Sequence, residues 1–271
     1  MRPPIALVLL TVPSLLLLGA ACGSPNSSLT REDKDAGAAA ADGGNGDAPG
    51  QRSNNSMPEG DLFGSTVLSY VTLSAGVVAT VGVVVPLASI AQAPEDGPFQ
   101  NDLILNMPQQ AREQTMLSQL RINWLAHGHG PTPYSAPHFD LHFYRGTNAQ
   151  IDAIECTDSR AFPASILTSD HAEPSTCVAG MGFHSWPSAD LEPGAVFSAS
   201  LILGYYDQRI VFIEPMIAKS TLLSKQDIEL AVSRPQSSGG APTLYPTRMR
   251  GIYDAQSGGY RFEFDKFEPI D

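Results

Sequence analysis

Four of the six histidines in this chain fall within one short stretch, between His127 and His142. A neutral imidazole is the commonest metal ligand in proteins, and histidine is also a frequent carrier of protons near neutral pH. The stretch opens with His127-Gly-His129 and closes with a segment that holds His138, Asp140 and His142. These residue types, at this density, predict a site that binds a metal ion or moves a proton.

The segment 137–144 alternates polar and apolar side chains along its length. Successive side chains of a β-strand point to opposite faces of its sheet. We therefore expect one apolar face in the core and one polar face that lines a pocket. The apolar face would carry Phe139, Leu141 and Phe143, and the polar face His138, Asp140, His142 and Tyr144.

Strand geometry limits which of these side chains could share one ion. At about 3.3 Å per residue, His138 and His142 lie about 13 Å apart along a strand. Because an imidazole nitrogen must lie about 2.0–2.1 Å from zinc, both histidines could bind one ion only if the strand bulged. Asp140 could join either histidine as a ligand, or it could orient a ligating imidazole.

Two further candidates lie downstream, His184 among aromatic residues and Glu214 within an apolar strand. A carboxylate in an apolar strand is rarely buried without a partner. We expect the His127/His129 pair to bind a divalent metal, with zinc the first candidate, together with one strand residue and with Glu214 or His184. In an enzyme the metal would activate water or polarise a carbonyl, and Glu214 or Asp140 would accept the proton. The predicted ligands are His127, His129, His138, His142 and His184.

Two alternatives remain open for the same residues. The histidines could line a metal-free polar pocket for a small ligand, or they could form a structural network of hydrogen bonds. Either would suit a non-catalytic ligand-binding or envelope-structural module, which could be a homo-oligomer. Imidazoles that converge would favour a metal, whereas scattered rings would favour these alternatives. His171, within a polar loop, is expected to be exposed.

The N-terminus is typical of an export signal. A short positive start precedes an apolar run that ends in small residues before Cys22, so residues 1–21 are predicted to be a signal peptide of the lipoprotein type. Cys22 would carry the lipid that holds the protein to a membrane in the cell envelope, outside the cytoplasmic membrane. The motif departs from the usual lipoprotein pattern, because Leu18 lies four residues before the cysteine and not three.

The composition changes after this signal. Residues 22–60 are rich in Gly, Ala, Ser and Asp and predict a disordered tether, whereas residues 61–271 predict a single β-rich domain. The formal net charge is −12 and the chain has no basic block, so nucleic acid is not an expected partner.

Cys156 and Cys177 are the two remaining cysteines. An exported protein would hold them in an oxidising compartment, where a disulfide between them could persist. The alternative is a pair of unconnected buried thiols.

Short apolar and β-branched segments separated by Gly and Pro predict a mainly β fold, an antiparallel barrel or sandwich with one or two short helices. Hairpins are expected at 65–85 and 195–217, and short helical segments at 87–92 and near 218–227. The other predicted strands are 103–106, 117–125, 139–144, 228–232, 248–253 and 260–264.

The ordered motifs of the chain resemble those of a bacterial extracytoplasmic β-rich family of unknown function, whose prototype is a hypothetical protein of a thermophilic bacterium. The resemblance covers roughly residues 64–268. It implies a β-rich fold, leaves self-association open and supplies no activity. The motifs are His127-Gly-His-Gly-Pro, Pro137-His-Phe-Asp-Leu-His-Phe-Tyr144, Met181-Gly-Phe-His-Ser-Trp186, Tyr205-Tyr-Asp207, Phe212-Ile-Glu-Pro-Met216 and Tyr245-Pro-Thr-Arg248.

Overall fold

The computed structural model describes residues 57–271. The predicted signal peptide, Cys22 and nearly all of the predicted tether lie outside the described residues. The first strand of the described residues begins at Glu59, two residues before the predicted start of the β-rich domain at residue 61. Within residues 57–271, no helix is both long enough and apolar enough to cross a membrane.

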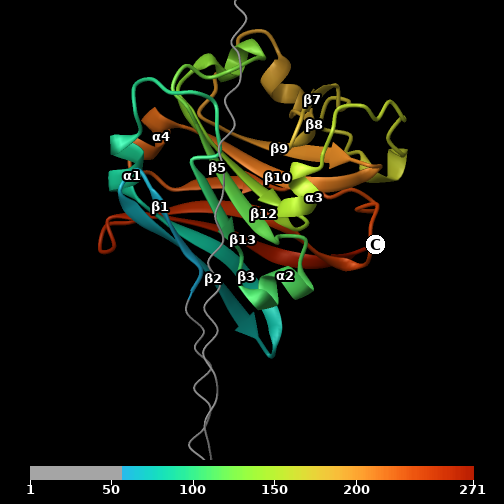
Figure 1. The fold of residues 1–271 in the computed structure, drawn as a ribbon, viewed down its shortest axis with the longest axis horizontal. Helices are drawn as coiled ribbons and strands as arrows, with labels where there is room; N and C mark the ends of the chain where they lie inside the picture. Colours follow the sequence, from blue (N-terminus) through green and yellow to red (C-terminus); the bar gives the residue numbers. More distant parts are fainter. Residues whose placement is uncertain (1–56) are drawn as a thin grey trace, which may run out of the picture. The chain divides into compact units, whose positions relative to one another are not determined.

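Two antiparallel sheets form the domain (Figure 1). The six-stranded sheet has the order β1 (Glu59–Leu62), β2 (Ser65–Ser74), β3 (Val77–Pro86), β13 (Gly259–Ile270), β12 (Thr243–Asp254) and β11 (Ile228–Ala231). The seven-stranded sheet has the order β4 (Leu103–Asn106), β5 (Gln119–Leu125), β6 (His138–Tyr144), β10 (Arg209–Ala218), β9 (Ala199–Tyr206), β8 (Gly182–Ser185) and β7 (Thr176–Val178). The predicted β class is confirmed as a sandwich, because both sheets are open and no barrel closes.

The helices are short and lie between strands. They are α1 (Leu87–Gln92), α2 (Gln109–Gln114), α3 (Asn148–Asp152) and α4 (Lys219–Leu223), with 3₁₀ turns at Thr132–Ser135, Ala164–Ile166 and Ser188–Leu191. The described residues thus contain four α-helices where one or two were predicted. The extra two, α2 and α3, span only six and five residues, so neither could show a helical repeat of apolar positions.

The predicted hairpin at 65–85 is confirmed as β2 and β3. Ala75 and Gly76 connect the strands with φ values of 51° and 82°. Two consecutive residues with positive φ form the two-residue turn that matches the twist of antiparallel strands. Because β3 lies between β2 and β13, it is apolar on both faces, as a central strand requires.

The main core lies between the sheets. Val81, Val83 and Phe262 of the six-stranded sheet belong to the same buried cluster as Phe139 and Leu141 of β6. A second apolar cluster lies on the opposite face of the seven-stranded sheet, and the chain between β6 and β9 contributes to it. Its members are Tyr134, Tyr144, Ile151, Ile154, Met181, Trp186, Ile202, Val211, Phe212 and Met216. The seven-stranded sheet is therefore covered on both faces, which explains how polar strand residues become buried.

The predicted disulfide is present and joins Cys156 to Cys177 with a Cα–Cα distance of 5.7 Å. It ties β7 to the segment after α3. Replacing both cysteines with serine should lower the free energy of unfolding by about 3 kcal/mol, the loop-closure value for a loop of roughly twenty residues. Denaturant unfolding with and without reductant measures this. The double variant is the control, because reductant should leave its free energy of unfolding unchanged. Equal stability of the variant and the native protein without reductant would contradict the prediction.

Candidate metal centre

Strand β6 places its polar face against the second apolar cluster, as the alternation predicted. His138, Asp140 and His142 are each at most 3% exposed. Glu214 of β10 lies beside His142, because Ile213 pairs with Phe143 and Met216 pairs with Asp140. Strand β8 brings in His184, whose ring centroid lies 6.1 Å from that of His142. Buried histidines and carboxylates from three strands therefore meet on one face of the sheet.

These side chains form two groups of three. In the first triad, His129, His138 and Asp140 bring one ligand atom each to within 4.8 Å of one another. In the second triad, His142, His184 and Glu214 do the same. Each triad has two imidazoles and one carboxylate. The two triads separate His138 from His142, as the strand spacing requires.

The first triad is held together by Asp140. Its carboxylate lies 3.1 Å from His138 Nε2 through Oδ1 and 3.5 Å from His129 Nε2 through Oδ2. Burial opposes ionisation of Asp140, but the two imidazoles outweigh it and hold the pKa of this carboxyl below its usual range. For His129 burial also opposes the charge, yet the bond to Asp140 raises the pKa above its ordinary value.

The second triad is buried more deeply. Glu214 Oε1 lies 3.4 Å from His142 Nε2, and Oε2 lies 3.9 Å from His184 Nε2. Burial lowers the pKa of His142 to about 3 and that of His184 to about 4. Burial, together with the charge of Asp140, raises the pKa of Glu214 well above its ordinary value. Both histidines are therefore neutral at pH 7, the state in which an imidazole binds a metal.

Three of the four imidazoles are oriented by the backbone. The Nδ1–H groups of His129 and His138 each donate to a carbonyl oxygen at 2.7 Å, those of Gly130 and Ala136. His184 Nδ1 donates to Thr176 O at 3.4 Å. In the neutral ring such a bond fixes the tautomer and leaves a lone pair on Nε2, the arrangement typical of metal-ligating histidines.

His142 is held by aromatic side chains. Its ring stacks on Tyr144 at 5.6 Å with an interplanar angle of 9°, and the Phe212 ring meets it edge-on at 5.0 Å. Tyr144 in turn lies beneath the guanidinium of Arg121, which pairs with Asp152 at 2.8 Å. The packing leaves the ring little freedom to turn away from Glu214.

The tight turn at Gly128 presents His129 to the first triad. Gly128 has a φ of 62°, and a Cβ at this position would lie 2.2 Å from the carbonyl oxygen of Tyr134. That carbonyl accepts from the His129 N–H at 3.0 Å. A side chain at 128 must therefore displace the backbone that carries His129.

Replacing Gly128 with alanine should weaken metal binding at the first triad about tenfold or more. Backbone strain of about 1.4 kcal/mol in the metal-binding conformation corresponds to a tenfold loss of affinity. Calorimetric titration with zinc measures the affinity of each triad. Gly97→Ala is the matched control, since a Cβ there meets no atom within 4 Å. Unchanged affinity in the Gly128 variant would show that the turn does not position His129.

Not every predicted ligand joins these groups. The structure does not bring His127 to either triad; its side chain is 75% exposed and pairs with Asp96 at 2.6 Å. The left-handed turn at Gly128 separates His127 from His129. The two groups also differ from the expected set, since His129 joins His138 and Asp140 rather than Glu214 or His184. His171 is not exposed as predicted, because its Nε2 bonds to Leu201 O at 3.1 Å and its side chain is 4% exposed.

Five of the six triad residues line one cavity of about 420 Å³; the sixth, His138, does not border it. The other lining residues include a set of apolar side chains that the sequence analysis missed as site residues, Phe99, Leu125, Val178, Met181 and Trp186. Apolar residues of this kind occur throughout the strands and loops. No spacing distinguishes a cavity wall from the core.

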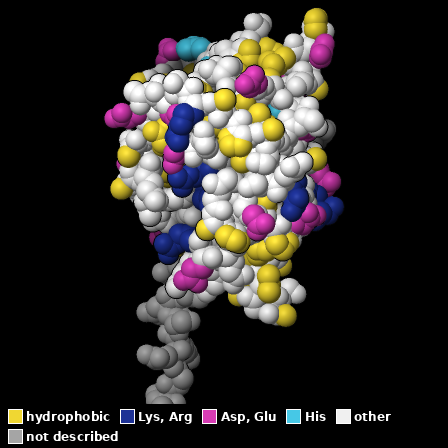
Figure 2. Space-filling view, turned by 90° about the vertical axis from the view of Figure 1, so that its right-hand side faces the viewer, with side chains coloured by type: hydrophobic (Ala, Val, Ile, Leu, Met, Phe, Trp, Pro, Cys, Tyr) yellow, Lys and Arg dark blue, Asp and Glu magenta, His cyan; other side chains and the backbone are white. Residues whose placement is uncertain are grey.

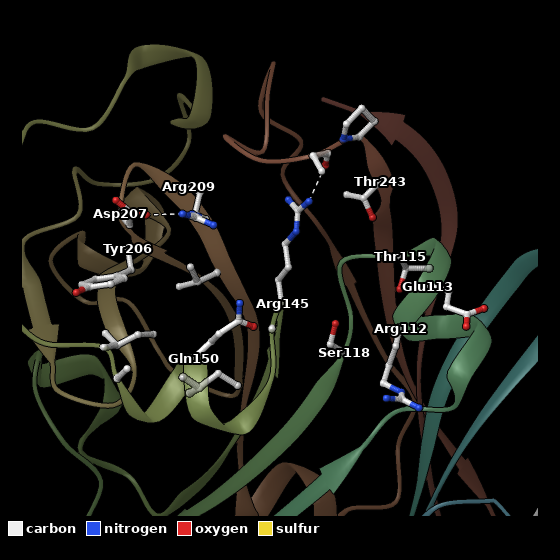
Figure 3. Close-up of a pocket in the computed structure, with 17 residues that line it drawn as sticks. Arg112, Glu113, Thr115, Ser118, Arg145, Gln150, Tyr206, Asp207, Arg209 and Thr243 are labelled. Atoms are coloured by element: carbon white, nitrogen blue, oxygen red, sulfur yellow. Dashed lines mark hydrogen bonds and ion pairs between the residues drawn. The ribbon is translucent and has the colours of Figure 1, made fainter.

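A larger cavity, of about 600 Å³, lies elsewhere and is lined by Arg112, Arg145 and Arg209 (Figure 3). Two of these arginines have structural partners. Arg145 donates to Ser238 Oγ at 2.9 Å and to Ala241 O at 2.6 Å. Arg209 pairs with Asp207 (Figure 3). Neither triad borders this cavity, so the smaller one is the candidate site.

Comparison of the chain with protein-family models, with curated proteins and with solved structures gave no match. The site must therefore be interpreted from its own geometry.

Proposed function

We propose that this domain binds two divalent metal ions, one at each triad. The observation that carries the proposal is a set of buried polar atoms, in the described part of the chain, that lack hydrogen bonds. They include His138 Nε2, Asp140 Oδ1, His142 Nε2 and Glu214 Oε2. A buried polar group without a partner costs about 1–3 kcal/mol, so four in one place need a common explanation.

The arrangement of His138 and Asp140 favours a cation over a hydrogen-bonded network. Their nearest atoms are 3.1 Å apart, yet the contact lacks the angles of a regular hydrogen bond, so His138 Nε2 and Asp140 Oδ1 have no other partner within residues 57–271. The Nδ1–H of His138 is already used by Ala136 O, which leaves a lone pair on Nε2 beside the carboxylate oxygen. When the ring is neutral, two lone pairs at this separation repel unless a cation lies between them, as in two ligands of one ion.

The donor set indicates the class of ion. Two imidazoles and one carboxylate hold zinc at catalytic centres, and the same three groups hold iron(II) in non-haem oxygenases. Both arrangements leave coordination positions open for water or a ligand. Zinc remains the first candidate, and the reaction, if there is one, would use a metal-bound water or a polarised carbonyl. In this arrangement the main role of Asp140 and Glu214 would be to bind the metal ions, and not to accept a proton.

We further propose that the metal centre works outside the cytoplasmic membrane, with Cys22 carrying the lipid anchor, and that the chain belongs to the extracytoplasmic family whose motifs it resembles. The Cys156–Cys177 disulfide supports an oxidising compartment. Intact-mass analysis of the native protein tests the anchor, because the mature chain should begin at Cys22 and carry acyl groups.

Elemental analysis of purified protein, reconstituted in turn with zinc, iron(II) and manganese(II), tests metal binding. We expect close to two equivalents of a preferred ion. His129→Ala should lose about one equivalent, because it removes a ligand of the first triad. His127→Ala is the matched control, since it is the same substitution two residues away at a histidine outside both triads. Absence of metal after reconstitution would overturn the proposal.

A further inference from the structure

Both triads open into the same space. His129 and Asp140 of the first and His142, His184 and Glu214 of the second line the one cavity. Asp140 and His142 are next-but-one neighbours on β6, so their Cα atoms lie about 6.6 Å apart. Ions at the two triads would therefore be close enough for one small molecule to reach both.

The charge of such a centre calls for an anion. Each triad contributes a single carboxylate, so two divalent ions would keep two positive charges in a mostly buried site. No Lys or Arg lies among the residues that line the cavity, and the remaining walls are uncharged. A bound anion would thus interact with the ions themselves and not with protein cations.

The rest of the cavity is apolar. Val178, Met181 and Trp186 come from the β7–β8 hairpin and the residue that follows it, Phe99 comes from the loop before β4, and all four border the same space as the triads. Trp186 continues the face of β8 that carries His184, and the two rings stack at 6.5 Å. On the face in Figure 2 the hydrophobic side chains form several separate groups. The cavity combines an apolar wall with the two metal triads.

We propose that the cavity binds a small organic oxyanion, a phosphate- or carboxylate-type head group on an apolar substituent. The head group would bridge the two ions, and the substituent would lie against Phe99, Met181 and Trp186. This inference rests on the proposed metal binding. It assigns the class of ligand that the centre takes.

Calorimetric titration of three probes into the two-ion protein tests it. Phenylphosphonate has both features, methylphosphonate lacks the ring, and benzyl alcohol lacks the charge. We expect phenylphosphonate to bind about tenfold or more tightly than methylphosphonate, since burial of one aromatic ring is worth that much. We also expect it to bind more tightly than benzyl alcohol, because benzyl alcohol has no anionic oxygens to bind the two ions. Phenylacetate in a fourth titration compares a carboxylate head group with the phosphonate; tighter binding than benzyl alcohol is expected for it too. Metal-free protein should show no saturable binding of any probe.

Two surface variants distinguish the contribution of the apolar wall to ligand binding from general effects of a substitution on the fold. Phe99 is 53% exposed, so Phe99→Ser should fold normally, and we expect it to weaken phenylphosphonate binding several-fold while leaving methylphosphonate unchanged. Val196→Ser is the matched control, because Val196 is 91% exposed and does not line the cavity.

Metal content is measured on every sample. If the protein holds two ions but binds phenylphosphonate no better than methylphosphonate, the ligand inference fails and the metal proposal stands. If the protein takes up no metal, both fail.

Discussion

Replacing Glu214 with glutamine should remove one metal ion per chain and, at pH 7, stabilise the metal-free protein by about 1–3 kcal/mol. The two effects have one cause. Glu214 is 1% exposed, and its nearest groups in the second triad are His142 and His184, which burial keeps neutral. A carboxylate in this place is costly without a cation, whereas a glutamine amide is neutral and can donate to His142 Nε2.

The stabilisation should depend on pH in a defined direction. Burial and the charge of Asp140 raise the pKa of Glu214 in the folded protein above its ordinary value of 4.5. A carboxyl group whose pKa is raised by folding costs the folded protein no stability at a pH below the pKa of the unfolded state. As the pH rises from there toward the pKa of the folded state, the group destabilises the folded protein progressively. The advantage of the glutamine variant should therefore be small near pH 4.5 and grow toward pH 7.

Urea unfolding in the presence of a chelator, at pH 4.5 and at pH 7, measures the stability change, and elemental analysis measures the ion. Glu192→Gln is the control, because Glu192 is exposed and should change stability by less than about 0.5 kcal/mol. A glutamine variant at 214 that retains both ions, or that is less stable than the native protein without metal, would show that Glu214 is a structural residue.

The polar face of β6 could be predicted because strand alternation is local. The pattern around Asp140 places His138 and His142 on one face and separates them by a fixed distance, whatever the rest of the chain does. That distance correctly predicts that the two histidines lie in different triads. Hairpin β2–β3 was predictable for the same reason, since Ala75-Gly76 and the flanking β-branched residues are adjacent in sequence.

The partners of these residues could not be predicted, because they depend on register between distant segments. Glu214 meets His142 through the pairing of β10 with β6, and His184 reaches them from β8 on the far side of β9. His129 and His127 were equivalent in sequence. Only the turn at Gly128, which is set by the approach of Tyr134 O, directs one inward and the other to solvent.

Sheet closure was also undecidable from sequence. Whether the strands form a barrel or a sandwich depends on what the edge strands pair with, and short edge strands such as β1 and β7 have weak sequence patterns.

One helix that the sequence analysis missed, α3, does have a recognisable sequence pattern. Thr147 and Gln150 form a reciprocal capping box at the start of α3, and this pair of residue types three apart is a recognised mark of a helix N-terminus.

The largest effect we expect comes from the ions themselves, because a ligand that binds only the folded state stabilises it by mass action. At a free concentration one hundred times its dissociation constant, each ion should add about 2.7 kcal/mol, so two ions should add about 5 kcal/mol. Urea unfolding of the two-ion and metal-free proteins measures this. No difference between them would mean that neither triad binds metal in the folded state.

A chelator should remove the two ions in separate phases, because the triads differ in access to solvent. The His129 side chain is 32% exposed on its loop, whereas those of His142 and Glu214 are each 1% exposed. The first triad should therefore lose its ion faster. Loading with cobalt(II) makes each loss visible by absorbance: His129→Ala should lack the fast phase, Glu214→Gln the slow one, and His127→Ala should keep both. A single phase in the native protein, with a rate that His129→Ala does not alter, would contradict the assignment of one ion to each triad.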